Sequence, residues 1–533
     1  MMPSIELNNI ASPCSAAFEL SMQDGSSLNI AEVIRVVPTK RLVCKAVWNH
    51  QQVYAKLFIG PDAAKYAIRD KAGVESLLNA KIATPKILYF GQLTNGNLHN
   101  VSDSVFVMLL ESIGNELSDS SNIEALWLQL PLASEARFVI AQCLVQTVAQ
   151  HHDAGLQQTD LYLKNFILSN EKVYTLDGDG IKPLPNHFNE GQITLRNLSA
   201  LLSKFDVLEL EKWLPQLLKT YADARGWKIL PRLDLLQHLI TVHRNKVSNH
   251  YANKKVFRTC TDVQFSVRKD EKLSGTVFGC KKLNGFLQAH FSLYTWLASA
   301  YVQFVELVKI EVLDASLNAP AFKSGNTCTV GLIEVNAIDG ALNKNDAQKI
   351  VVKRYNIKSV SHALLRAVRK TRAAISWGNA HRLLLLGLPT AAPVALLETR
   401  YFFGLLKSKS YFLSAYIDAP DVAEYFANER DIAQRAEAVK QVVELFYRLY
   451  LLKISHGDLK ASNIKMLNHQ PILIDLDSMQ QHGFGLIATH NHARDLRRFM
   501  RNWQQDERLS NAFEKSFKVI YANHQPLKLA KID

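Results

Sequence analysis

Two sets of oxygen-bearing side chains recur with the same spacing in the two halves of this 533-residue chain. In each set an Asn follows an Asp by five positions, and a second Asp follows the first by seventeen. The sets are Asp160, Asn165 and Asp177, and Asp458, Asn463 and Asp475. Carboxylate and amide oxygens are the ligands that Mg²⁺ prefers. In phosphoryl transfer the first Asp orients the acceptor hydroxyl, while the Asn and the later Asp hold magnesium against the nucleotide phosphates. The spacing therefore predicts phosphoryl-transfer chemistry in both halves.

The neighbouring sequence predicts the elements that position these side chains. Helix-like apolar runs, residues 136–148 and 442–452, precede the first Asp of each set. Short strand-like runs, residues 173–176 and 471–474, end at the second Asp. The periodicity places each set on a loop after a helix and a turn after a strand, as a catalytic loop and a metal-binding turn require. Accidental recurrence, and a related fold that has lost catalysis, are the alternatives.

A kinase-like N-lobe also needs a strand Lys for the phosphates and, usually, a helix Glu that holds this Lys. Lys56 in Val53–Phe58 and Lys353 in Ile350–Tyr355 lie in apolar strands, where an unpaired ammonium is costly. Glu75 is the expected partner of Lys56. Aligning the second half by its next segment puts His381 opposite Glu75, so we expect another residue to hold Lys353, or a weaker hold.

A loop that covers the phosphates should precede the Lys strand. Residues 322–330 of the second half contain small and hydrogen-bonding residues with one Gly, Gly325, and fit that role. Residues 37–44 of the first half contain no Gly. Neither segment is a full glycine-rich motif.

These residues resemble those of the bacterial lipopolysaccharide core kinases, the Kdo/WaaP group with its InaA-like relatives. The resemblance spans most of both halves. The segments that carry it in the second half are residues 256–261, 379–384, 388–390, 456–463, 474–477 and 494–496, and those in the first are 54–58, 152–156, 160–166 and 196–198.

The resemblance implies a two-lobed kinase fold in each half, ATP with Mg²⁺, and a core sugar hydroxyl, on heptose or Kdo, as the acceptor. It makes Asp160 and Asp458 catalytic candidates. Its phosphate-binding candidates are Lys56, with Glu75, and Lys353, and its metal candidates are Asn165, Asp177, Asn463 and Asp475. The second half departs from the pattern at His381, and the first has Gln158 where the second has His456.

We expect an α+β protein of two tandem kinase-like domains, each with a small β-rich N-lobe and a helical C-lobe. The domains are predicted at residues 1–245 and 246–533, with the junction after the helical stretch Leu233–Val242. The second domain carries an inserted apolar segment near residues 284–312. Its part from Phe286 to Val308 is interrupted by polar residues, which favours a helix packed on the protein over one on a membrane surface or across it.

Composition favours a cytoplasmic protein. The first residues carry no basic region ahead of an apolar core, so a standard signal peptide is not expected. The six cysteines form no Cys-x-x-Cys pair, which argues against a zinc site or a disulfide framework.

The formal net charge of +13 calls for an anionic partner. Basic residues cluster at residues 254–258, 366–372 and 494–501. Such clusters can be solvated helix faces, or can contact anionic lipid headgroups and a lipopolysaccharide precursor on the cytoplasmic face of the inner membrane. The chain shows no recognised nucleic-acid motif, so no nucleic-acid partner is expected.

Three functions fit these features. The first is an ATP-dependent kinase of the lipopolysaccharide inner core. The second is a tandem protein in which one half catalyses and the other is a pseudokinase or scaffolding domain; with Glu75 present, the first half is favoured as the catalytic one. The third is a kinase-like phosphotransferase that acts on a protein or small molecule.

Overall fold

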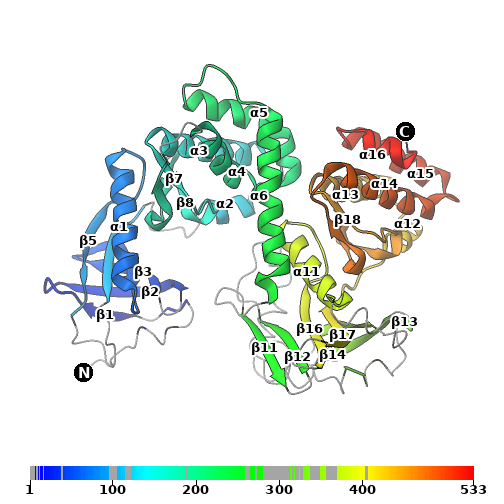
Figure 1. The fold of residues 1–533 in the computed structure, drawn as a ribbon, viewed down its shortest axis with the longest axis horizontal. Coiled ribbons are helices and arrows are strands. Elements are labelled where there is room, and N and C mark those ends of the chain that lie inside the picture. Colours follow the sequence, from blue (N-terminus) through cyan, green and yellow to red (C-terminus); the bar gives the residue numbers. More distant parts are fainter. Residues whose placement is uncertain are drawn as a thin grey trace. The chain divides into compact units, whose positions relative to one another are not determined.

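The computed structural model describes residues 7, 10, 13–15, 17–37, 40–94, 105–113, 122–185, 190–257, 264–270, 273–279, 313–314, 317, 323–324, 328–335, 348–355, 369–401 and 406–532. The chain divides into two compact units, Met1–His243 and Arg244–Asp533. Helices and antiparallel sheets occur in both, so the predicted α+β class is confirmed (Figure 1). The division falls inside one continuous helix, α6 (Leu233–Asn253), rather than after a helix that ends at Val242.

The first unit begins with an antiparallel six-stranded sheet, in which helix α1 (Ala63–Asn79) follows strand β4. Apolar side chains on one face of the sheet form a core that includes Leu42, Ala55, Leu57 and Val107. The strands, in sheet order, are β1 (Phe18–Ser21), β2 (Ser27–Val37), β3 (Arg41–Trp48), β4 (Gln51–Phe58), β6 (Phe106–Glu111) and β5 (Ile87–Gln92).

The rest of the first unit is mostly helical. Helix α3 begins at a Ser134 cap, whose hydroxyl accepts a hydrogen bond from the backbone N–H of Arg137. A core of buried Leu, Val, Trp and Tyr side chains joins α3 to α5. The elements are α2 (Ile123–Gln129), α3 (Glu135–Asp153), β7 (Leu156–Gln158), η4 (Leu163–Asn165), β8 (Phe166–Ser169), β9 (Lys172–Thr175), η5 (Gly178–Gly180), β10 (Ile181–Pro183), α4 (Glu190–Leu202), α5 (Val207–Ala224) and α6.

The second unit repeats this order with a seven-stranded sheet. Helix α11 (Arg372–Leu385) follows the Lys353 strand and begins at a Thr371 cap. Trp377 of α11 is fully buried against the sheet core. The strands, in sheet order, are β11 (Gln264–Asp270), β12 (Leu273–Gly279), β16 (Pro393–Tyr401), β17 (Leu406–Ala415), β15 (Gln348–Tyr355), β14 (Cys328–Val335) and β13 (Lys323–Ser324).

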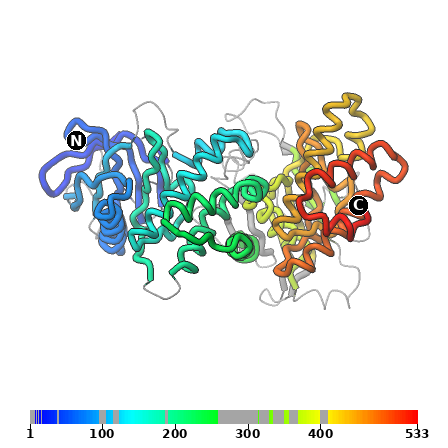
Figure 2. The backbone as a smooth tube through the Cα atoms, turned by 90° about the horizontal axis from the view of Figure 1, so that it is seen from above, coloured from blue at the N-terminus to red at the C-terminus, as the bar shows by residue number. Residues whose placement is uncertain are grey.

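Helices of the second unit pack through a buried aromatic cluster that includes Phe446, Phe499, Phe513 and Phe517. These helices are orange to red in Figure 2. The elements are α12 (Val422–Asn428), α13 (Ile432–Leu451), β18 (Ile454–Ser455), η8 (Ala461–Asn463), β19 (Ile464–Leu467), β20 (Gln470–Leu473), η9 (Leu476–Ser478), β21 (Gln480–Gln481), α14 (Gly485–Met500), η10 (Arg501–Trp503), α15 (Glu507–Ile520) and α16 (Gln525–Ala530).

A two-residue hairpin accounts for the shared spacing of the two sets. In the first unit β8 and β9 are joined by Asn170 and Glu171, and both have positive φ. In the second, Asn468 and His469 join β19 and β20 in the same way. Two residues with positive φ form the tight turn that matches strand twist. The two hairpins therefore contain the same number of residues. Each one brings the chain back beside its Asn, and the second Asp of the set follows the second strand.

Several predicted features lie outside the described residues. They include the apolar segment 284–312, residues 322 and 325–327 of the expected phosphate-covering loop, and Arg366 of one basic cluster. Among the helices that the structure describes, none is long and apolar enough to cross a membrane.

Candidate active site

Both predicted lysines lie on interior strands of their sheets. Lys56 on β4 pairs with Val43 of β3 and Met108 of β6. Lys353 on β15 has neighbours on β14 and β17 in the same manner. Their side chains are 9% and 13% exposed, so each ammonium needs a partner.

The partner of Lys56 is Asp70, not Glu75. The Lys56 ammonium contacts the two Asp70 carboxylate oxygens at 3.0 and 2.8 Å, and it donates to the Leu176 carbonyl at 3.3 Å. Glu75 instead pairs with Lys71 on the exposed side of α1. The expected pairing of Lys56 with Glu75 is therefore wrong, because Glu75 lies off the buried face of the helix. A helix Glu beside Lys56 therefore no longer favours the first half as the catalytic one.

Sequence reasoning missed Asp70, although a signal was present. The buried face of α1 carries Ala63, Ala67, Asp70, Val74 and Leu77, at helical spacing. An acidic residue on an apolar helix face that lies near a buried strand Lys indicates an ion pair. Glu75 does not belong to that face.

In the second unit the acidic partners of the strand lysine come from the turn after β20 and not from a helix. Lys353 contacts Asp475, and its ammonium lies 3.3 Å from the Asp477 carboxylate. Arg372 at the start of α11 donates to Asp477 at 2.7 Å. Helix α11 contains no acidic residue, and His381 is buried beside Trp377, with ring centroids 4.4 Å apart. The strand Lys and the predicted metal Asp are thus in direct contact.

The catalytic-loop residues of each set also come together. Asn463 donates through its amide to the Asp458 carbonyl at 2.8 Å and to the Asp458 carboxylate at 3.1 Å. Asn165 donates to the Asp160 carbonyl at 2.8 Å. The Asn463 carbonyl accepts from the backbone N–H of Ile474, the residue before Asp475, at 3.0 Å. This bond joins the loop to the turn.

The loops are supported differently in the two units. Asp495 on α14 accepts hydrogen bonds from the backbone N–H groups of His456 at 2.7 Å and Gly457 at 3.1 Å. The corresponding residue of the first unit, Asn197, donates to the Gln158 carbonyl at 2.9 Å. A carboxylate that fixes two backbone donors is therefore present only in the second of these two loops.

The electrostatics of the second site favour an anionic Asp475. Burial raises the pKa of Asp475, but Lys353, His456 and Arg372 outweigh burial and leave the pKa below its usual value. Burial lowers the pKa of Lys353, yet Tyr355, Asp475 and Asp477 raise it above the ordinary range. Burial also lowers the pKa of His456. The Nε2 atom of its ring lies 3.0 Å from the backbone carbonyl oxygen of Ile474.

The donor set of the second unit fits Mg²⁺. The Asn463 amide nitrogen is directed to Asp458, which leaves its amide oxygen for a cation, and Asp475 supplies a carboxylate. Asp475 has φ 61° and ψ 62°, a left-handed conformation that non-glycine residues adopt rarely and that functional sites often contain. One or two protein oxygens together with substrate phosphates are the usual ligands of magnesium.

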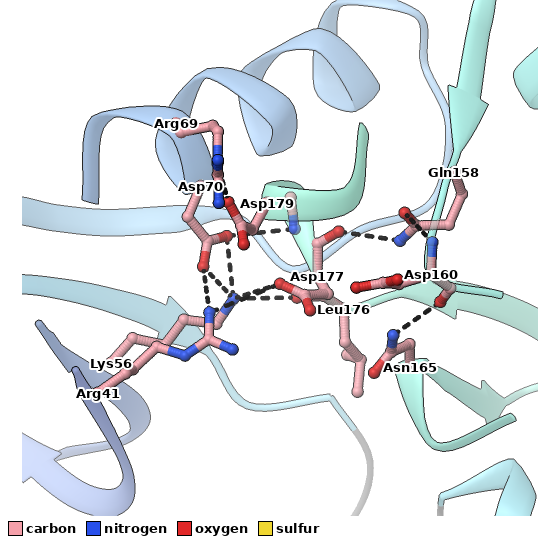
Figure 3. Close-up of polar contacts among 11 residues, drawn as sticks. Arg41, Lys56, Arg69, Asp70, Gln158, Asp160, Asn165, Leu176, Asp177 and Asp179 are labelled. Carbon is pink, nitrogen blue, oxygen red and sulfur yellow. Dashed lines mark hydrogen bonds and ion pairs between the residues drawn. The ribbon is translucent and has the colours of Figure 1, made fainter. Parts of the chain in front are cut away.

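The donor set of the first unit does not fit Mg²⁺ in the same way. Asp177 has φ −113° and ψ 99°, an extended conformation. Its carboxylate lies 3.7 Å from the Arg41 guanidinium and 3.8 Å from the Lys56 ammonium (Figure 3). Two protein cations lie near Asp177, whereas Lys353 contacts Asp475, so the two units differ in the extra guanidinium and in the backbone conformation of this Asp.

One arginine of the C-terminal basic cluster belongs to the site. Arg498 on α14 contacts the Asp458 carboxylate at 2.8 Å, and its second nitrogen donates to the Gly457 carbonyl at 3.3 Å. From the sequence, Arg498 was predicted only as one member of the basic cluster at residues 494–501. Its helical position, three residues after Asp495, could have indicated a place beside the same loop.

Comparison with known proteins finds a family model that matches part of the second unit. Residues 321–521 match the model of the lipopolysaccharide kinase (Kdo/WaaP) family. No curated protein matches the chain. The match includes Lys353, Asp458, Asn463 and Asp475 and lies within the second unit. The predicted resemblance is confirmed for this segment. Members of that family are kinases, and the match is consistent with an ATP-dependent phosphotransferase that acts on a sugar hydroxyl.

Proposed function

We propose that the second unit phosphorylates a heptose or Kdo hydroxyl of the lipopolysaccharide inner core, using ATP and Mg²⁺. The observation that carries the proposal is the contact between Lys353 and Asp475, beside a loop in which Asn463 is bonded to Asp458. This arrangement brings a phosphate-binding cation, two metal ligands and a candidate base to one place. The family match supports the acceptor class.

Each residue has a distinct role in this proposal. Asp458 accepts a hydrogen bond from the acceptor hydroxyl, aims it at the γ-phosphorus and takes its proton. Lys353 binds phosphate oxygens once ATP competes for it with Asp475 and Asp477. Asn463 and Asp475 would hold Mg²⁺, which supplies neutralisation of the phosphate charge when bound. Asp495 fixes the backbone of residues 456–457, so that Asp458 keeps its orientation.

The second unit is the better candidate for catalysis. It has His456 and Asp495 at the positions of Gln158 and Asn197, and its Asp475 adopts the left-handed conformation. We therefore propose a tandem arrangement of kinase-like units, in which the second catalyses and the first has another role.

The acceptor proposal is supported by a basic helix face. Arg494, Arg498 and Arg501 are exposed and follow each other at helical spacing, and Arg498 reaches Asp458. An anionic acceptor, such as a phosphorylated lipid-linked core at the inner membrane, would find positive charge along its approach to the base. A neutral sugar or an unmodified serine would gain less from this face.

The test is phosphate transfer to defined acceptors. Purified chain is incubated with γ-labelled ATP, Mg²⁺ and either dephosphorylated heptose-containing core, core truncated to Kdo, or a protein such as casein. We expect labelling of a lipopolysaccharide acceptor, with mass spectrometry placing the phosphate on heptose or Kdo. Labelling of casein alone would favour a protein acceptor instead. No labelling of any acceptor would contradict the proposed activity.

The basic face has its own test. Arg494→Gln and Arg501→Gln together should raise the KM for lipopolysaccharide severalfold with little change in the KM for ATP, because neither residue contacts the Lys353 cluster. Lys440→Gln, an exposed charge change on α13, is the matched control. Equal KM values in wild type and double variant would remove this face from acceptor binding.

A further inference from the structure

The first unit places two cations, Arg41 and Lys56, beside Asp177, the residue that corresponds to Asp475. The Arg41 guanidinium on β3 lies 3.1 Å from the Asp70 carboxylate and 3.7 Å from that of Asp177. Lys56 reaches the same two carboxylates, at 2.8 and 3.8 Å. Figure 3 shows both cations pointing between Asp70 and Asp177. Asp70 is fully buried and Arg41 is 14% exposed, so the charges interact with little screening by water.

The carboxylates of this cluster already have cationic partners from the protein. The Asp177 carboxylate lies 3.7 Å from the Arg41 guanidinium and 3.8 Å from the Lys56 ammonium. Arg41 and Lys56 thus face Asp70 and Asp177, and Arg69 pairs with Asp179, the counterpart of Asp477. In the second unit Asp475 and Asp477 balance Lys353 and Arg372. A Mg²⁺ ion bound to Asp177 would have to displace the Arg41 guanidinium.

Two further differences point the same way. The extended backbone of Asp177 differs from the left-handed one of Asp475, so the two carboxylates are presented differently. The loop support is neutral, because Asn197 stands where the second unit has Asp495. The loop of the first unit therefore lacks the supporting carboxylate that the second unit has.

The cations that remain are suited to phosphate. A guanidinium offers planar paired donors that match phosphate oxygens, and a Lys ammonium adds a point charge. Arg41 and Lys56 come from adjacent strands, and a phosphate group that bound both would replace carboxylate oxygens they now contact.

We propose that the first unit binds the phosphates of a nucleoside triphosphate without a divalent cation, with the Arg41 guanidinium in the place of a metal ion. No phosphoryl transfer takes place there. The first unit is then a nucleotide-responsive companion of the catalytic unit rather than a second catalyst. This role goes beyond the proposed kinase activity, and it can hold whether or not the second unit uses lipopolysaccharide.

The test is ATP binding with and without metal. The full chain carries Lys353→Gln and Asp475→Asn, which remove the phosphate and metal contacts of the second unit. Calorimetry then measures the Kd for ATP in EDTA and in excess MgCl₂. We expect binding in EDTA that is at least as tight as binding in MgCl₂. Binding that requires MgCl₂, or no binding in EDTA, would overturn the proposal.

Arg41→Gln in the same background distinguishes a metal substitute from a structural residue. We expect it to weaken binding in EDTA by about tenfold or more and to make binding favour MgCl₂, because loss of the guanidinium frees Asp177. Lys45→Gln removes a charge on the same strand, where Lys45 pairs with Glu32, and should leave both Kd values unchanged. An unchanged ratio of the two Kd values in Arg41→Gln would refute the role of Arg41.

A second measurement guards against misfolding of the double variant. Hydrogen exchange of the unmodified chain is recorded in EDTA with and without ATP. We expect ATP to slow exchange in peptides that cover residues 41–58 and 172–180. Protection confined to the second unit would overturn the proposal.

Discussion

The Asp70 carboxylate holds the Lys56 ammonium at 2.8 Å, from a position one and a half turns before Glu75 on the same helix. Glu75 pairs instead with Lys71 at the surface. The pair that orders the buried lysine is thus an Asp on the apolar face of α1, and its neighbour Arg41 shares that Asp.

Asp70→Asn should destabilise the first unit by about 3–5 kcal/mol, because it leaves two buried cations short of a charge partner. Glu75→Gln should change stability by less than about 0.5 kcal/mol, since its pair is exposed. Thermal unfolding, monitored by hydrogen exchange in peptides of the first unit, measures the stability of both variants. Equal effects of the two variants would contradict the assignment of Asp70.

Asp495→Asn should slow phosphate transfer roughly a hundredfold, because the backbone that positions Asp458 loses its carboxylate acceptor. The KM for ATP should change little, since Asp495 does not contact Lys353 or Asp475 in this structure. Steady-state kinetics with Glu437→Gln, an exposed change on α13, as the control measures this. A raised KM with an unchanged kcat would show that Asp495 acts on binding instead.

Gly73→Ala should disrupt the junction of α1 with the turn after Asp177. A Cβ on Gly73 would lie 1.9 Å from the Gly178 carbonyl oxygen, and backbone cannot move aside easily. We expect a loss of about 3 kcal/mol or more, at the upper end of overpacking costs. Gly191→Ala, which meets no atom within 4 Å, should be neutral or slightly stabilising. Chemical denaturation compares the two, and equal stability of both variants would disprove the close approach.

Acid should destabilise the second unit through His381. Burial lowers the pKa of His381 to about 3, from an unfolded value near 6.5, so the unfolded chain binds the proton first. The stabilising contribution is complete above pH 6.5 and is lost as pH falls towards 3. At pH 5 the loss is about 2 kcal/mol for this group. His381→Leu should flatten the decline of stability between pH 6.5 and 5; an identical slope in both proteins would exclude His381.

The spacing of the oxygen ligands could be predicted from the sequence because local geometry fixes it. A loop, a two-residue hairpin and a turn occupy the same number of residues in both halves, so Asp458, Asn463 and Asp475 could be proposed as candidates without tertiary information. The same holds for Lys56 and Lys353, whose apolar strands fix their place in the sheet.

Long-range partners could not be predicted in this way. Asp477 lies 3.3 Å from Lys353 only because a turn far along the chain meets the sheet, and Asp495 reaches the loop from another helix. The error at Glu75 has a different cause. Glu75 was chosen for its distance along the chain from Lys56, without regard to which face of the helix carries it. Arg41 was missed because the sequence around it resembled a loop without glycine rather than a strand carrying a functional cation.

The most direct measurement compares the two candidate bases in one assay. Labelled γ-phosphate transfer from ATP to dephosphorylated lipopolysaccharide core is recorded for wild type, Asp458→Asn and Asp160→Asn. We predict that Asp458→Asn loses at least about 99% of the activity, because a positioned general base contributes about a hundredfold or more to the rate. Asp160→Asn should retain most of the activity. Loss of activity in Asp160→Asn with Asp458→Asn still active would place catalysis in the first unit and contradict the central claim.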